Sequence, residues 1–188
     1  MNKIKIENKV CLYPLPTVLV GAKVNGTPNY LNVSYCGMVN RVPCMMSISL
    51  NRSHYTCDGI RENNCFSINL PSTKMLTLTD YCGIVSGKNV DKSKLFNNFY
   101  GELKNAPMIE ECPVNIECEL IQELDLGGSN ITFIGRVIDV YTEEKYFSNN
   151  TLDIKKIHPI LFSVSELNYY CVGEKIGKAW NVGKSLDI

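Results

Sequence analysis

Four short segments carry polar side chains of the kinds that hold a phosphate group or a flat polar ring. In the first, residues 28–37, Asn29 offers a hydrogen-bond donor and an acceptor together, and Tyr35 offers a flat apolar face. An ordinary turn followed by a strand would also account for this segment. Both interpretations stay open from these residues alone.

The second segment, residues 49–56, joins a strand pattern to a helix start. It gathers one cation, Arg52, with the hydroxyls of Ser49, Ser53 and Thr56. Helix N-termini expose free N–H groups and bind phosphate readily. Simple N-capping by Ser53 or Thr56 needs no ligand and accounts for the same residues.

Two further segments are weaker signals. Residues 86–92 combine the Ser86 hydroxyl, a glycine and the cations Lys88 and Lys92, which could close over an anion. Charged loops are usually just solvated, so this interpretation needs support from elsewhere. Residues 127–130, which end at Asn130, are typical of a hairpin turn.

The common catalytic signatures are missing from the sequence. It contains no GxSxG, GxxxxGK[ST], GxGxxG or HExxH motif, and its two histidines are far apart. If the protein catalyses a reaction, a cofactor is therefore expected to supply the chemistry.

The elements that must position these segments are mostly strands. Alternating or β-branched apolar runs predict strands at residues 17–24, 45–50, 65–70, 114–126, 131–141 and 159–164, with turns at 25–26 and 127–128. Residues 143–156 read as a polar loop. Helices are predicted between the strands. Thr56 would cap a helix that ends at residue 63, and Ser72 would cap one that ends at residue 81. A third, short helix would begin at Asp91.

The strand-rich order favours a mainly β, α+β fold. It predicts an antiparallel, Greek-key-like barrel with peripheral helices and not a doubly wound parallel sheet. The chain of 188 residues is long enough for one well-cored domain, and we expect a single domain over residues 1–188.

Composition narrows the class of protein. Lys+Arg and Asp+Glu each total 19, so the chain has no net charge to draw it onto nucleic acid or an anionic membrane. No apolar run approaches the roughly 20 residues that span a bilayer. Residues 1–10 lack the apolar centre of a signal peptide, so we expect a cytoplasmic protein without nucleic-acid or membrane partners.

The nine cysteines form no CxxC pair, and their number is odd. A secreted disulfide framework usually has an even number of cysteines in a shorter chain. We interpret them as reduced thiols that fill the core, and we expect no metal site. A cysteine-based metal or redox module is the remoter alternative.

In their joint order and spacing, these segments resemble the flavin reductase-like family, in particular its flavoredoxin branch. The resemblance covers nearly the whole chain, and each of its motifs is short. They are residues 14–20, Pro28-Asn29, 40–43, 49–56 with Ile60, Ser86-Gly87 with Asp91-Lys92, 116–118, 133–137, and Tyr169-Tyr170 with 173–177.

The resemblance implies an FMN-binding split β-barrel and a homodimer with FMN near the subunit interface. By position, the residues at the flavin and ribityl side would be Asn29, Ser34, Tyr35, Cys36 and Gly37. Those at the phosphate turn would be Ser49, Asn51, Arg52, Ser53 and Thr56, with Ser86 and Lys92 nearby.

The chain departs from the family pattern at two positions of this site. Family members often carry Trp where Tyr35 stands, and the exchange keeps an aromatic face. They also often carry His where Asn130 stands. The resemblance therefore implies that Asn130 contacts the cofactor in place of this His. If that histidine assists hydride transfer, the resemblance implies a weaker reductase here.

The implied activity is that of an NAD(P)H-dependent flavin reductase or flavoredoxin-type oxidoreductase. NADH or NADPH would reduce noncovalently held FMN, which would pass electrons to free flavin, a partner protein or another acceptor. The alternative is a non-catalytic FMN-binding protein that carries electrons for a redox partner.

Overall fold

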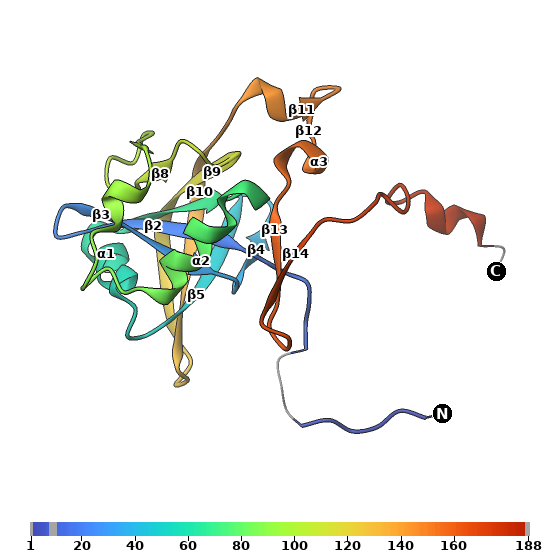
Figure 1. Ribbon diagram of the computed structural model, residues 1–188, viewed down its shortest axis with the longest axis horizontal. Coiled ribbons are helices and arrows are strands. Elements are labelled where there is room, and N and C mark those ends of the chain that lie inside the picture. The colour runs from blue at the N-terminus through green and yellow to red at the C-terminus, as the bar shows by residue number, and fades with distance from the viewer. Residues whose placement is uncertain (1, 8–10, 187–188) are drawn as a thin grey trace.

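The computed structural model describes residues 2–7 and 11–186, so the masked residues of the N-terminal ten and of the C-terminus lie outside the account that follows. The fold is mainly β, and all of its strand pairs are antiparallel (Figure 1). One seven-stranded sheet has the order β3-β2-β6-β9-β10-β5-β4. Its strands are β2 (Val18–Val24), β3 (Thr27–Val33), β4 (Cys36–Asn40), β5 (Met45–Asn51), β6 (Cys65–Leu70), β9 (Val114–Asp125) and β10 (Asn130–Thr142).

Two hairpins build most of this sheet. Strands β2 and β3 meet at Asn25 and Gly26, which both have positive φ as a tight hairpin turn requires. Strands β9 and β10 form the longer hairpin, with two register shifts that bend it. Both hairpins and their turns confirm the sequence prediction.

The sheet curls around one apolar core. Buried side chains from β2, β3, β5, β6, β9 and β10 pack into a single cluster that includes Ile48, Phe66 and Phe133. Helix α1 (Tyr55–Asn63) adds Cys57 and Ile60 to it. This helix touches β2 so closely that a Cβ at Gly59 would lie 2.2 Å from the Lys23 carbonyl oxygen. The antiparallel fold is thus confirmed, while closure into a split barrel stays a prediction, because the described pairings do not join β3 to β4.

A second, smaller core covers the other face of β2 and β3. Leu19 and Tyr30 point to this side and pack against Cys82 of helix α2 (Leu76–Ile84) and against Phe96. The Tyr30 and Phe96 rings meet edge to face at 5.4 Å. The 3₁₀ helices η1 (Thr73–Met75) and η2 (Lys92–Leu95), and the short strands β7 (Asn98–Phe99) and β8 (Met108–Ile109), complete this layer.

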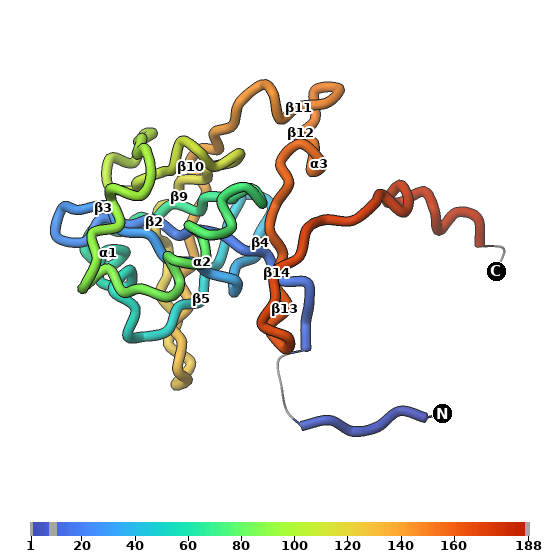
Figure 2. Tube along the Cα trace, viewed as in Figure 1, coloured from blue at the N-terminus to red at the C-terminus, as the bar shows by residue number. Residues whose placement is uncertain are grey.

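A separate three-stranded sheet joins the two ends of the chain. Strand β1 (Leu15–Pro16) pairs with β13 (Ile160–Ser163), which pairs with β14 (Asn168–Cys171). Beyond β14 the tail leaves the body, as does the N-terminal segment (Figure 2). The tail includes η4 (Val182–Ser185) and carries Trp180 with 95% of its surface exposed.

Ser72 is the N-cap residue of η1, as predicted, although its side chain makes no capping bond, and α2 follows η1 directly. The structure corrects two other local predictions. His54, and not Thr56, is the N-cap residue of α1. Residues 143–156 are not one loop, because they hold η3 (Glu144–Tyr146), β11 (Phe147–Ser148), β12 (Thr151–Leu152) and the first residues of α3 (Ile154–Ile157). Asp91 does cap η2, accepting from the Ser93 N–H, as predicted.

Five of the nine cysteines are buried, and none of the nine forms a disulfide. Over residues 2–7 and 11–186, no three His, Cys, Asp or Glu side chains come together in a way that could hold a metal ion. No helix in the same ranges is long and apolar enough to cross a membrane.

Candidate functional site

Two pockets meet at His54, where β5 turns into α1. The first, here the helix pocket, has a volume of about 250 Å³ and lies between the start of α1, strand β3 and the chain that follows α2. The second, here the strand pocket, has about 230 Å³ and lies among β3, β5, the start of β10 and the C-terminal hairpin. His54 lines both, so the two pockets adjoin.

The pockets collect ten of the thirteen predicted cofactor contacts. The helix pocket is lined by Asn29, Ser53, Thr56, Ser86 and Lys92. The strand pocket is lined by Ser34, Tyr35, Ser49, Asn51 and Asn130. Residues from four separate segments of the sequence thereby line two adjoining pockets.

Asn29 and Thr56 form the wall of the helix pocket. The Asn29 Nδ2 donates to Thr56 Oγ1 over 2.9 Å, and both residues are buried. The Asn29 Oδ1 is buried without a hydrogen-bond partner among the described residues. A Cβ at Gly87 would lie 2.0 Å from this Oδ1, so only glycine lets the 86–92 loop approach so closely.

Lys92 brings a positive charge to the same wall. Its side chain is 2% exposed, and its Nζ donates to the Tyr30 and Cys82 carbonyl oxygens, both at 2.8 Å. Burial lowers the pKa of this ammonium group. An ammonium held by carbonyls and not by a carboxylate keeps its charge available to an anion.

The strand pocket has a more apolar lining with an aromatic side. Phe162 reaches it from β13, and Tyr35, 39% exposed, lies on the link between β3 and β4. Ser49 shares a 2.7 Å hydrogen bond with Thr132 across the β5–β10 pair. Such a lining suits a flat ring system with a polar edge.

The C-terminal hairpin is fastened beside the strand pocket by one tyrosine. The Tyr169 hydroxyl donates to Asp80 over 2.8 Å and accepts from the Asn32 amide over 3.0 Å. Burial and the Asp80 carboxylate raise the Tyr169 pKa to about 12. The Asn32 Oδ1 is buried without a partner among the described residues and belongs to the pocket lining.

His54 stands at the junction of the two pockets. Its Nδ1 is buried and has no partner in the described part of the chain. Burial first, and the Lys92 charge second, lower the pKa of the imidazole. The lowered pKa favours the neutral ring, in which Nδ1 has no partner among the described residues.

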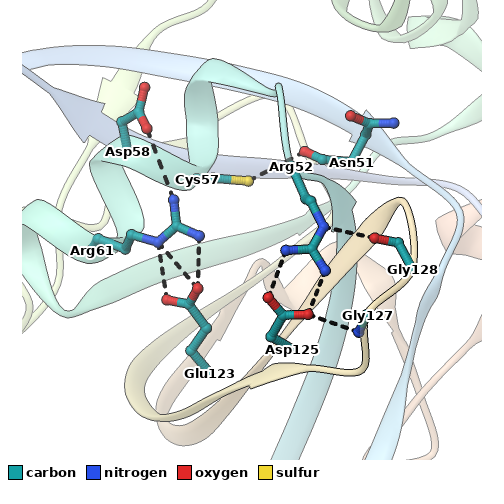
Figure 3. A network of polar contacts seen from close by, with 9 residues as sticks. All are labelled: Asn51, Arg52, Cys57, Asp58, Arg61, Glu123, Asp125, Gly127 and Gly128. Atoms are coloured by element: carbon teal, nitrogen blue, oxygen red, sulfur yellow. Dashed lines mark hydrogen bonds and ion pairs between the residues drawn. The ribbon is translucent and has the colours of Figure 1, made fainter.

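Three predicted contacts lie outside both pockets. Arg52 binds Asp125 with both terminal guanidinium nitrogens, and its Nε donates to the Gly128 carbonyl oxygen over 2.6 Å (Figure 3). Cys36 packs against the main core, and burial raises its pKa to about 12. Gly37 is half-buried in β4 next to it.

A similar clamp fixes α1 to the same hairpin. Arg61 binds Glu123 through Nε and one terminal nitrogen, 2.6 Å from Oε1 at the shortest (Figure 3). The Arg52 and Arg61 pairs thus hold the β9–β10 hairpin against the turn and helix that line the site.

The donor and acceptor set fits a ligand with hydroxyl groups, a phosphate and a flat ring. Unpartnered buried acceptors at Asn29 and Asn32 call for O–H or N–H donors, since such atoms are costly to leave unpaired. Lys92 and the hydroxyls near α1 suit a phosphate, and the strand pocket suits a ring. Whether each of these residues touches a cofactor stays a prediction.

The lining residues that the sequence prediction missed include four polar or aromatic ones, Asn32, His54, Tyr55 and Phe162. The first three lie in the polar segments 28–37 and 49–56, so the sequence did offer them as candidates. Phe162 gave none, because an apolar residue in a predicted strand is expected in the core.

Comparison with known proteins bears on this geometry. The model of the flavin reductase like domain matches residues 10–166. The flavoredoxin from Methanosarcina acetivorans is 46% identical, with a TM-score of 0.95 over 98% of this chain and 99% of its own. The flavoredoxin of Desulfovibrio vulgaris (Miyazaki F) is 33% identical, with a TM-score of 0.89 over 96% and 99%. At 21% identity, an FMN-binding protein from Thermus thermophilus shares the fold, with a TM-score of 0.78 over 95% and 99%.

Proposed function

The chain belongs to the flavin reductase like family, and from that premise we propose that it binds FMN noncovalently and passes electrons from NADH or NADPH to an acceptor. One observation supports this most strongly. Buried atoms of Asn29, Asn32 and His54 lack a hydrogen-bond partner among the described residues, and these three residues line the two pockets together with the buried Lys92.

The helix pocket would hold the phosphate and the ribityl chain. Lys92 supplies the charge, and Ser53, Thr56 and Ser86 supply hydroxyls. Because Thr56 Oγ1 already accepts from Asn29, its own proton is left to donate to a phosphate oxygen. The free Asn29 Oδ1 would accept from a ribityl hydroxyl.

The strand pocket would hold the flavin ring. Tyr35 and Phe162 offer apolar faces, while Ser49, Asn51 and Asn130 offer polar groups for the ring edge. Bound FMN would supply the chemistry, which is acceptance of a hydride and its release as electrons. The protein's residues would orient the ring and keep water from one side of it.

A non-catalytic electron carrier is the second candidate. Among the described residues of the strand pocket, the titratable side chains are Tyr35 and His54, and neither is a carboxylate or a thiol. Such a lining suits a carrier that a redox partner protein reduces, because it offers few groups for proton transfer. Asn130, at the position where family members often carry histidine, points the same way.

We also propose that the protein is a cytoplasmic homodimer. Exposed apolar side chains on the projecting tail, Ile176, Trp180 and Val182, support a second copy that covers them. Light scattering after size exclusion tests this: a mass near twice 21.1 kDa is expected, and a monomer over the working concentration range contradicts it.

The absorbance spectrum of the purified protein tests the main proposal. A yellow protein with oxidised-flavin bands is expected, and those bands should bleach when NADH or NADPH is added without oxygen. Bands that stay until a reduced partner protein is added would favour the carrier. A colourless protein that takes up no FMN on titration would overturn both.

A further inference from the structure

Tyr169 is not part of the strand pocket lining, but it contacts two residues that are. Its hydroxyl accepts from Asn32 Nδ2 over 3.0 Å, and the centre of its ring lies 5.4 Å from that of Phe162. Phe162 and Tyr169 are direct partners across the β13–β14 pair, whereas Asn32 belongs to β3. One side chain thus contacts both a polar and an aromatic wall of the pocket.

The hydrogen bonds of Tyr169 determine which way round the Asn32 amide lies. The hydroxyl has a single proton and donates it to the Asp80 carboxylate over 2.8 Å. Burial and this carboxylate raise the pKa of Tyr169 to about 12, so the proton stays in place at neutral pH. Toward Asn32 the hydroxyl can therefore only accept, which requires the Nδ2 end of the amide.

This arrangement leaves the Asn32 oxygen over. Its Oδ1 is buried and has no hydrogen-bond partner among the residues that the structure describes. If the amide turned, Oδ1 would meet a hydroxyl oxygen whose proton is already given to Asp80. A buried acceptor without a partner is costly, so the arrangement favours a ligand that brings an N–H or O–H donor to Asn32.

We propose that Tyr169 and Asp80 are positioning residues that make the strand pocket selective for a flat ring with an N–H donor at its edge. The inference rests on the proposed function, in which this pocket holds the flavin ring. The pyrimidine edge of oxidised flavin carries such a donor, the imide N3–H, between two carbonyl acceptors. Asn32 Oδ1 would accept from N3–H, and Tyr169 and Asp80 would act only through Asn32.

Titration of flavin-free protein with FMN and with FMN methylated at N3 tests the proposal. The methylated analogue keeps the phosphate and the ribityl chain but has no imide proton. Wild type should bind the analogue about tenfold or more weakly than FMN, because the Asn32 acceptor stays unpaired. Tyr169→Phe keeps the ring against Phe162 but frees the amide to turn, so the preference for FMN should fall to about threefold or less.

A second variant and a control separate this role from general support of the hairpin. In Asp80→Ala the Tyr169 hydroxyl is free to donate to Asn32 Oδ1, so the preference should fall as it does in Tyr169→Phe. Tyr170→Phe is the matched control, because Tyr170 is the next residue of β14 and its hydroxyl donates to Glu166 over 2.9 Å, outside the strand pocket. This variant should keep the full preference for FMN.

Three results would overturn the inference and leave the proposed function standing, since FMN still binds in each. Equal affinities of wild type for the two flavins would mean that no acceptor meets N3–H. A preference that stays unchanged in Tyr169→Phe or in Asp80→Ala would assign it to the bulk of the methyl group. An equal fall in Tyr170→Phe would reduce the effect to a loosened hairpin. Binding of neither flavin by wild type would remove the proposed function as well.

Discussion

The side-chain amide of Asn29 donates to the hydroxyl of Thr56 over 2.9 Å and so ties strand β3 to the first turn of helix α1. Both residues are buried, and they are 27 positions apart in the sequence. This bond fixes the position of the strand relative to the helix start. It also leaves one acceptor of Asn29 and one proton of Thr56 for a ligand.

Removal of the Thr56 hydroxyl should weaken FMN binding and the fold together. Thr56→Ala leaves the buried Asn29 Nδ2 without a partner, which costs about 1–3 kcal/mol of unfolding free energy. Loss of a hydrogen bond to a charged phosphate lowers FMN affinity about tenfold or more. Denaturant unfolding and FMN titration measure the two effects. Thr56→Ser keeps the hydroxyl and should restore both; unchanged FMN affinity in Thr56→Ala would leave Thr56 a purely structural residue.

Lys92 should distinguish FMN from riboflavin. Lys92→Met keeps the aliphatic stem in its buried place but removes the charge that would face the phosphate. We expect FMN affinity to fall about tenfold or more and riboflavin affinity to change much less, since charge-assisted bonds contribute roughly 1.5–3 kcal/mol. Parallel titrations with the two flavins check this. Equal losses for both would count against a phosphate contact.

Arg52 should matter little for FMN, although its position in the sequence suggested a phosphate contact. Its guanidinium is engaged by Asp125 and Gly128, and exposed pairs of this kind contribute little to stability. Arg52→Gln should therefore lower the unfolding free energy only slightly and leave FMN affinity within about twofold. A large, selective loss of FMN affinity would show that Arg52 leaves Asp125 for the ligand.

Gly87→Ala should damage the helix pocket. The added Cβ would lie 2.0 Å from Asn29 Oδ1, so the loop or the amide must move. FMN affinity should fall about tenfold or more, which corresponds to at least 1.4 kcal/mol. Gly128→Ala is the control, because nothing lies within 4 Å of a Cβ there. Equal behaviour of the two variants would mean that the 86–92 loop adapts without cost.

His54 should make stability depend on pH in the acid range. The folded-state pKa of His54 is lowered below its ordinary value of 6.5, so protonation favours the unfolded chain. Its contribution is fully present above pH 6.5 and is lost as pH falls through and below that value. Unfolding free energies of wild type and His54→Gln between pH 5 and 8 check this. The difference between the two proteins should shift against wild type as pH falls, and a constant difference would contradict the lowered pKa.

The fold was readable from the sequence where alternation was long. The hairpin of β9 and β10 was predicted because its apolar residues repeat with a period of two over more than ten positions. Strand β3 stayed one of two open interpretations of residues 28–37, since its polar residues Asn29 and Asn32 interrupt that pattern. Both residues line pockets, so residues of the candidate site weakened the strand signal.

Contacts between distant parts of the chain could not be predicted from the sequence. Arg52 meets Asp125 across 73 positions, and no local pattern shows that this carboxylate will engage the arginine. Phe162 reaches the strand pocket because β13 pairs with β1 at the other end of the chain. Within residues 49–56, the end of a strand and the start of a helix were predicted correctly because both are local features.

The C-terminal hairpin has a consequence for the timing of protein synthesis. Phe162 completes the strand pocket, and Tyr169 fastens the hairpin to Asn32 and Asp80. A nascent chain that ends at residue 150 holds every residue that lines the helix pocket but lacks one wall of the strand pocket. The strand pocket therefore takes its final shape later in synthesis than the helix pocket.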